Sequence, residues 1–233
     1  MRRFGIAAAA LGVLALTACG TTDTGTPTPS PSTATGTTLP STTSSPNATI
    51  PAAALLQAAD LDGVEPQPAT GEVAKELRPP RPCGNALPSD PARLGSVAVT
   101  AAILPVNGPP PPRTPSVIME TIVRYQAGAG TTAFTQLKTA LQRCPGELGK
   151  DKQRWELNGP ISAGDEAILF RMTTQFTYGD DTNLVTKTTP IALARLGDHL
   201  VLVTDLGWET SAGDEAAVRR LIVTAVGRLQ AAT

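Results

Sequence analysis

Three cysteines, at positions 19, 83 and 144, carry the most reactive side chains of this 233-residue chain. A thiol can be acylated, form a disulfide or bind a metal, depending on its surroundings and its compartment. An odd number of cysteines in an exported protein indicates that one of them has a separate role. The sequence around each cysteine therefore has to be considered in turn.

Cys19 ends an N-terminal pattern that is typical of export. Arg2 and Arg3 precede an apolar run over residues 4–16, which is too short for a permanent membrane span. The next residues, Leu16-Thr17-Ala18-Cys19, resemble a bacterial lipobox. We predict that residues 1–18 are a lipoprotein signal peptide. We also predict that Cys19 carries acyl chains such as palmitate, which anchor the protein to the extracytoplasmic face of the cell membrane. The alternative is an ordinary secretory signal with a chance cysteine.

Cys83 and Cys144 remain as an even pair in an oxidising compartment, which favours a disulfide between them. Such a bridge would close a loop of about 60 residues and contribute on the order of 4 kcal/mol in the chain-entropy model. Two free buried thiols are the alternative. A bridge would also exclude the usual Cys/His zinc site, so no metal is expected.

The remaining reactive groups do not form a catalytic pattern. His199 is the one histidine, beside a predicted turn, and the chain has no G-x-S-x-G elbow and no Walker A motif. Residues 128–133 match the dinucleotide fingerprint G-x-G-x-x-A, but the βαβ unit that should surround it is not visible. We read these glycines as a turn into a helix and expect neither an enzyme nor a cofactor.

Composition limits the partners and the organisation of the chain. The formal charge is −1, and loss of the signal peptide makes the chain more acidic by two, so nucleic acid is not expected as a partner. The Thr/Ser/Pro-rich stretch after Cys19 predicts a disordered tether over residues 19–49. We expect residues 50–233 to form a single ordered domain.

The domain is expected to begin with a helix near Thr49, with Leu55, Leu56 and Ala59 on its apolar side. Alternating and helical periodicities predict strands over 95–104, 116–125, 153–157, 166–178, 184–196 and 199–206, and helices over 132–143 and 213–229. Gly197-Asp198 is a hairpin turn, so the last strands should form an antiparallel meander. Ser211 and Asp214 resemble a capping box for the final helix.

Four charged residues fall at alternating positions on three of these strands: Glu120, Arg124, Arg171 and Arg195. On a common sheet face they would form a polar patch suited to an anionic ligand or partner. The alternative, which we prefer, is an ordinary solvated sheet face.

The order of several short motifs resembles the PknH-like extracellular sensor domain, found on receptor Ser/Thr kinases and envelope lipoproteins of high-GC Gram-positive bacteria. The resemblance covers roughly residues 50–232, and it follows the lipobox and the tether. Its first motifs are Leu55–Leu61, Arg-Pro-Cys at 81–83 and Tyr125 before a helix that ends in Cys144. Its last motifs are Gly-Asp-Glu-Ala at 164–167 and Arg-x-Gly-Asp-x-Leu-Val at 195–201. It implies an α+β fold, an antiparallel sheet with helices mainly on one face, and a cleft for a ligand. Such domains often have two disulfides, whereas only one is possible here.

Two functions follow. The first is a membrane-anchored, non-catalytic lipoprotein that binds an unknown small ligand or envelope protein, and the second is a structural or chaperone-like envelope lipoprotein without a small ligand. A closed, polar-lined cleft of a few hundred Å³ would favour the first. A flat face with an exposed apolar patch would favour the second.

Overall fold

A computed structural model describes residues 49–70, 77–104, 115–150, 152–177 and 182–233, all of which belong to one compact unit over residues 44–233. The predicted signal peptide, Cys19 and nearly all of the predicted tether lie outside the described residues. Within the described part of the chain, no helix is long and apolar enough to cross a membrane.

Seven strands form one sheet in the order β1-β2-β3-β7-β6-β5-β4, and all neighbouring strands are antiparallel. The strands are β1 (Gln67–Pro68), β2 (Arg93–Ile103), β3 (Ser116–Tyr125), β4 (Gln153–Pro160), β5 (Glu166–Thr177), β6 (Leu184–Leu196) and β7 (His199–Asp205). β3 and β6 have the predicted bounds, and the turn at Gly197-Asp198 joins β6 to β7 as expected. Antiparallel pairing throughout confirms that the glycines at 128–130 do not belong to a dinucleotide-binding βαβ unit.

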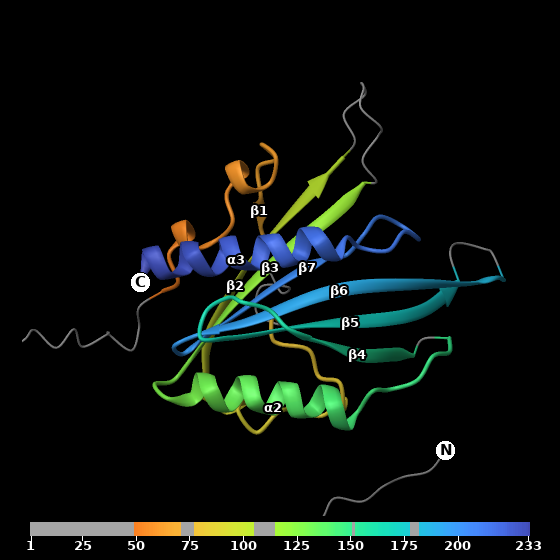
Figure 1. Cartoon of the computed structure of the whole chain (residues 1–233), viewed down its shortest axis with the longest axis horizontal. Helices are drawn as coiled ribbons and strands as arrows, with labels where there is room; N and C mark the ends of the chain where they lie inside the picture. Colours follow the sequence, from red (N-terminus) through yellow and green to blue (C-terminus); the bar gives the residue numbers. More distant parts are fainter. Residues whose placement is uncertain (1–48, 71–76, 105–114, 151, 178–181) are drawn as a thin grey trace, which may run out of the picture. The chain divides into compact units, whose positions relative to one another are not determined.

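The sheet carries an apolar core on each face, because alternate residues of its central strands point to opposite sides. On β6, Ala192 and Ala194 join the core under α3 (Glu215–Ala232), whereas Ile191 and Leu193 join the core under α2 (Ala129–Arg143). Figure 1 shows α3 and α2 on either side of the strands. The α+β class is confirmed; α3 and the 3-10 turn η1 (Ala52–Ala54) cover one face, and α2 covers part of the other.

Both long helices begin where the local sequence provides a suitable first residue. Gly128 precedes α2 with φ of 80°, a left-handed conformation that glycine adopts without strain. Asp214 precedes α3, and its side chain accepts hydrogen bonds from the N–H groups of Ala216 and Ala217. The predicted cap at Ser211 is wrong, because the Ser211 hydroxyl instead donates to the carbonyl of Trp208 and accepts from its N–H.

The predicted helix near Thr49 is also wrong. Residues 52–60 form the two 3-10 turns η1 and η2 (Ala58–Asp60), and Leu55 between them is extended. Both Leu55 and Leu56 are buried in the α3 core. A third 3-10 turn, η3 (Asp90–Ala92), precedes β2.

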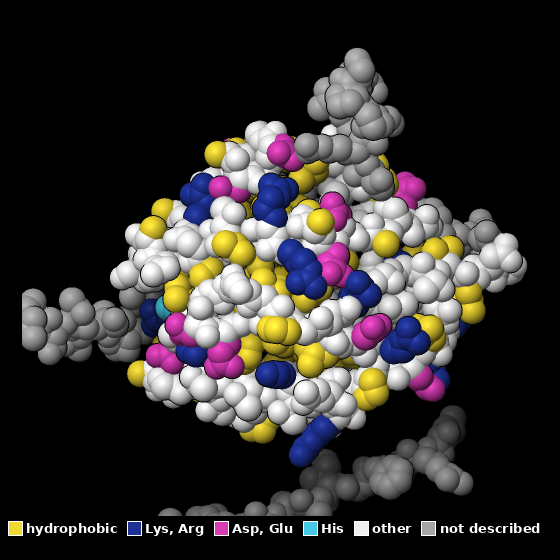
Figure 2. All heavy atoms as spheres, viewed as in Figure 1, with side chains coloured by type: hydrophobic (Ala, Val, Ile, Leu, Met, Phe, Trp, Pro, Cys, Tyr) yellow, Lys and Arg dark blue, Asp and Glu magenta, His cyan; other side chains and the backbone are white. Residues whose placement is uncertain are grey.

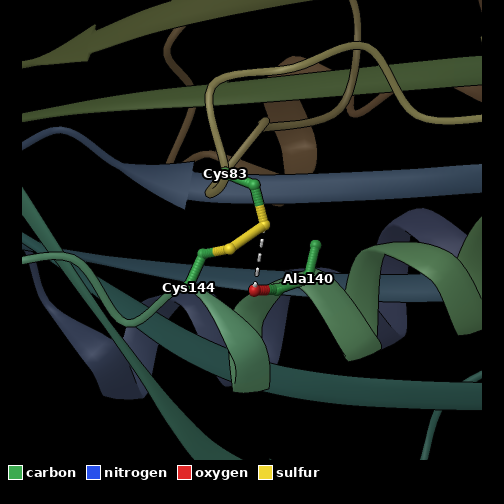
Figure 3. Close-up of a disulfide and its surroundings, with 3 residues drawn as sticks. All are labelled: Cys83, Ala140 and Cys144. Carbon is green, nitrogen blue, oxygen red and sulfur yellow. Dashed lines mark hydrogen bonds between the residues drawn. A yellow bond between two sulfur atoms is a disulfide. The ribbon is translucent and has the colours of Figure 1, made fainter.

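The predicted disulfide between Cys83 and Cys144 is present, with an S–S distance of 2.06 Å. Cys144 caps the C-terminus of α2, where its N–H donates to the carbonyl of Ala140, and Cys83 lies on the loop before β2 (Figure 3). The Sγ of Cys83 also lies 3.8 Å from the Ala140 oxygen. Because a bridged sulfur carries no hydrogen, we regard this approach as a van der Waals contact.

Candidate functional site

A cavity of about 390 Å³ lies where η2, the adjoining ends of β2 and β3, and the N-terminal part of α3 meet. Its apolar lining includes Leu61, Ile103, Ile118 and Leu221, which also take part in or pack against the α3 core. Its charged lining consists of four aspartates and one arginine, namely Asp60, Asp62, Asp205, Asp214 and Arg220. The cavity therefore combines apolar side chains with charged side chains that are mainly acidic.

Asp60 is held in place by contacts from two directions. Arg228 on α3 donates to both of its carboxylate oxygens, with 2.9 Å between Arg228 Nη2 and Asp60 Oδ1. The N–H of Gln57 donates to Asp60 Oδ2 at 2.8 Å. Burial opposes ionisation, but these hydrogen bonds outweigh it and hold the pKa of Asp60 below its ordinary value.

Asp205 and Asp214 build the connection between β7 and α3. The buried Asp205 carboxylate accepts from the N–H of Gly207 at 2.7 Å and from the N–H of Asp214 at 2.8 Å. Gly213 is required in this connection, because a Cβ there would lie 2.0 Å from the carbonyl oxygen of Asp205. Backbone hydrogen bonds therefore hold these two aspartates of the cavity lining in place.

Two buried oxygens in this region lack a hydrogen-bond partner within the described part of the chain. One is Ser116 Oγ, in the lining of the cavity. The other is Oε1 of Glu120, which lies four residues further along β3, on the same face of the sheet. Buried polar atoms normally have a partner, so each of these oxygens needs an explanation.

Glu120 is 0% exposed, and its Oε2 accepts from the N–H of Leu56 at 2.6 Å. Burial raises the pKa of Glu120 to about 7; the Leu56 N–H lowers it, the Asp60 carboxylate raises it, and Arg228 lowers it. Glu120 is therefore part of the interior and not of a solvated sheet face.

Arg124 and Arg171 lie on the same face of the sheet as Glu120, since their alternation places them with Ile122 and Leu169 of the α3 core. Arg171 binds Glu215 at the start of α3, with 3.0 Å between its Nε and Glu215 Oε2. Hydrogen bonds from Arg171 and Arg219 hold the pKa of Glu215 below its ordinary value. Two strands, β7 and β6, lie between Glu120 on β3 and Arg171 on β5, so Arg171 is not adjacent to Glu120.

Arg195 lies on the opposite face, because its alternation on β6 places it with Ile191 and Leu193 of the α2 core. It binds Asp165 at 2.7 Å and Glu166 at 3.3 Å. The four predicted ligand-binding residues therefore do not form one patch. Figure 2 shows charges of both signs interspersed on the face in view.

The described residues also lack the geometry of the common reactive sites. No group of three or more His, Cys, Asp or Glu in the described ranges is placed to hold a metal ion. His199 is half-buried at the start of β7, and burial together with the nearby Arg124 holds its pKa below the ordinary value. Cys83 and Cys144 are bridged and so are not nucleophiles.

Sequence reasoning did not find the residues that line the cavity. In the sequence, Asp60-Leu61-Asp62-Gly63 fits a helix end with a turn better than part of a calcium loop, and Asp214 fits a partner in a cap. Asp205 and Arg220 carried no signal, because nothing in a single sequence places the end of a strand beside a turn almost 150 residues earlier. The one available hint was the repeated hexamer Ser-Ala-Gly-Asp-Glu-Ala at 162–167 and 211–216, whose second copy contributes to the lining.

Comparison with known proteins yields one structural neighbour. No family model matches the chain, and no curated protein matches it. Among solved structures, the chain is similar to the extracellular domain of PknH from Mycobacterium tuberculosis, with 13% identity, a TM-score of 0.46 and coverage of 77% of this chain and 94% of that one. A likeness at this level does not carry a function across.

Proposed function

We propose that this protein is a membrane-anchored, extracytoplasmic lipoprotein that binds a small ligand in the cavity between η2, β2–β3 and α3, without chemically changing it. The observation that carries the proposal is the cavity itself. Its volume of about 390 Å³ falls within the range of small-molecule sites, which combine apolar walls with a few fixed polar groups. Its aspartates favour a ligand that presents hydrogen-bond donors beside an apolar part.

The positions of the reactive groups support binding rather than catalysis. None of the described residues that line the cavity is a histidine or a cysteine. His199 begins β7 whereas the cavity adjoins Asp205 at the end of the same strand, roughly 20 Å away at the rise of an extended chain. A serine such as Ser116 would therefore have no imidazole base within reach.

Filling the cavity tests the proposal. Ala217 lines the cavity on α3, whereas its neighbour Ala216 is exposed and lies outside the lining. We expect Ala217→Trp to abolish retention of a bound molecule, because the indole occupies its space, and Ala216→Trp to leave retention unchanged. Native mass spectrometry of the proteins purified from their own membrane, followed by release of the ligand, measures this difference.

Each other outcome of this comparison has a definite meaning. The same added mass in all three proteins would place the ligand outside this cavity. No added mass in the wild type, together with a co-purified envelope protein, would favour the structural or chaperone-like alternative.

The membrane anchor is tested separately at Cys19. We expect Cys19→Ser to move the protein from the membrane fraction to the soluble extracytoplasmic fraction, because one hydroxyl replaces the thiol that would carry the lipid. Intact-mass measurement of the wild type should show a chain that begins at Cys19 and carries acyl groups. A mature chain without the mass of acyl groups would be consistent with export but would contradict the membrane anchor.

A further inference from the structure

The segment that leads into the domain, residues 49–64, lies across the α3 face and contributes a wall of the cavity. We call this segment the strap. Ala54, Leu55, Leu56 and Leu61 of the strap are buried in the α3 core, and η1 contacts α3 directly. Asp60, Leu61 and Asp62 of the strap line the cavity. Any movement of the strap away from the sheet would therefore open the cavity on that side.

Two polar contacts fasten the strap to the rest of the domain. One is the ion pair between Asp60 and Arg228, which is partly accessible to water. The other is the hydrogen bond from the Leu56 N–H to Glu120 Oε2, which is buried. Glu120 thus holds the middle of the strap, between η1 and η2, while Arg228 holds its end.

Glu120 is an unusual group for such a contact. One carboxyl oxygen is satisfied by a single backbone N–H, and the other has no partner among the described residues. A buried carboxylate with one hydrogen bond loses much more solvation than that bond restores, whereas a neutral carboxyl group loses far less. The geometry therefore favours the neutral acid when the strap is closed.

The charged groups around Glu120 do not remove this preference. Asp60 of η2 repels a negative charge on Glu120, and Arg228 of α3 attracts it. On the sheet, Asp205 of β7 pairs with Ile118 on the same face, and Arg124 lies four residues along β3. The guanidinium group of Arg228 already donates two hydrogen bonds to Asp60. Its positive charge is therefore shared between two carboxyl groups and stabilises a charge on Glu120 less.

We propose that the strap is a proton-dependent latch on the cavity, held closed by the protonated carboxyl group of Glu120 and loosened when that group ionises. Glu120 is in this sense a positioning residue, since it acts through the strap and not on the ligand. The role of the latch in ligand capture rests on the proposed function, but the movement of the strap does not.

The direction of the pH effect follows from linkage. In an open strap Glu120 would be solvated and would titrate near its ordinary value of 4.5, whereas burial raises its pKa to about 7 in the closed state. Closure is therefore most favourable below about pH 4.5, and this advantage is lost as the pH rises to about 7. Between those values the closing equilibrium should weaken by up to about tenfold for each pH unit.

Amide hydrogen exchange of the full mature chain tests the latch without a ligand. We expect the protection factor of the Leu56 amide to fall by up to about 100-fold between pH 5 and pH 7, after correction for the intrinsic pH dependence of exchange. Glu120→Gln keeps a carbonyl oxygen for the Leu56 N–H and does not titrate, so its profile should be flat. The matched control Glu147→Gln changes an exposed glutamate and should retain the wild-type profile.

Three results would overturn the proposal. One is the same pH profile in the wild type and in Glu120→Gln. Another is an equal fall in protection at Leu137 in α2, because the protein would then be opening globally and not at the strap. If Glu120→Gln does not fold, NMR titration of the Glu120 carboxyl carbon in the wild type decides, and a midpoint between pH 4 and pH 5 would contradict the latch. None of these results depends on whether the cavity holds a ligand.

Discussion

The double replacement Cys83→Ser and Cys144→Ser should lower the free energy of unfolding by about 4 kcal/mol. The bridge joins residues 61 positions apart, and in the chain-entropy model a loop of this length restricts the unfolded chain by about that amount. Urea unfolding of the two proteins without reductant, monitored by circular dichroism, measures the difference.

Reduction provides the control for this prediction. A reducing agent should lower the stability of the wild type to that of the double variant and should leave the variant unchanged. The bridge ties the loop before β2 to the end of α2, and the same loop also contacts the middle of this helix, where the Ser89 N–H donates to Gln136 Oε1 at 2.9 Å. A loss below about 1 kcal/mol in both experiments would mean that this loop restrains the unfolded chain little, contrary to the entropic account.

Gly130→Ala should destabilise the protein by about 2–3 kcal/mol, although alanine is a better helix former than glycine. A Cβ at position 130 would lie 2.5 Å from the carbonyl oxygen of Gly197 and 2.7 Å from the Cα of Asp198. Both atoms belong to the backbone of the hairpin turn between β6 and β7, so neither can rotate away. The substitution must separate α2 from the sheet that it covers.

Gly227→Ala is the matched control, since Gly227 lies in α3 and a Cβ there would meet no atom within 4 Å. We expect this variant to be more stable than the wild type by about 0.5–1 kcal/mol, from helix propensity alone. Urea unfolding of both variants gives the comparison. Equal stability of Gly130→Ala and the wild type would show that the helix and the turn do not need their close approach.

Gly130 also shows that one sequence motif can serve different structural roles. The pattern at 128–133 matches the dinucleotide fingerprint, in which glycines let a backbone approach a phosphate. Here the close approach is to the turn at 197–198, and the Gly130 N–H donates to Asp198 Oδ1 at 3.1 Å. The local sequence indicates that another group lies close to the backbone of this glycine. Only the packing of α2 on the sheet determines that this group is the turn at 197–198.

The repeated hexamer provides a second example. In its first copy, Asp165 accepts from the N–H of Gly197 at 2.8 Å and Glu166 begins β5. In the second copy, Asp214 caps α3 and Glu215 begins that helix. Six identical residues thus lead into a strand and into a helix. A short continuous apolar run, Ile168–Phe170, follows the first copy, whereas apolar residues with a helical period follow the second.

The strands and helices of the sheet layers could be predicted because their signals are local. Alternation over β3 and β6 fixes which side chains face each core, and Gly197-Asp198 fixes the turn. The bridge between Cys83 and Cys144 was predicted because these two cysteines remain as a pair once Cys19 is assigned to the lipid anchor of an exported protein. The structure confirms this bridge. Lipidation of Cys19 remains a prediction of the sequence.

The strap and the cavity could not be predicted in this way. Adjacent leucines at 55 and 56 fit the apolar side of a helix, but both are buried in an extended connection between two short turns because α3 and β3 enclose them. Glu120 and Arg195 have the same sequence signal, a charge on an alternating strand. One is enclosed under the strap and the other forms ion pairs on the opposite face.

The sequence by itself predicted the longer strands, the two long helices, the bridge and export, because each of these depends on residues close together in the chain or on a simple count. Only the tertiary structure decided which charges are buried, which aspartates meet at one cavity and which segment forms its wall. The physical reason is that desolvation and ion pairing depend on neighbours brought together across the chain, such as Asp60 and Arg228, which are 168 residues apart.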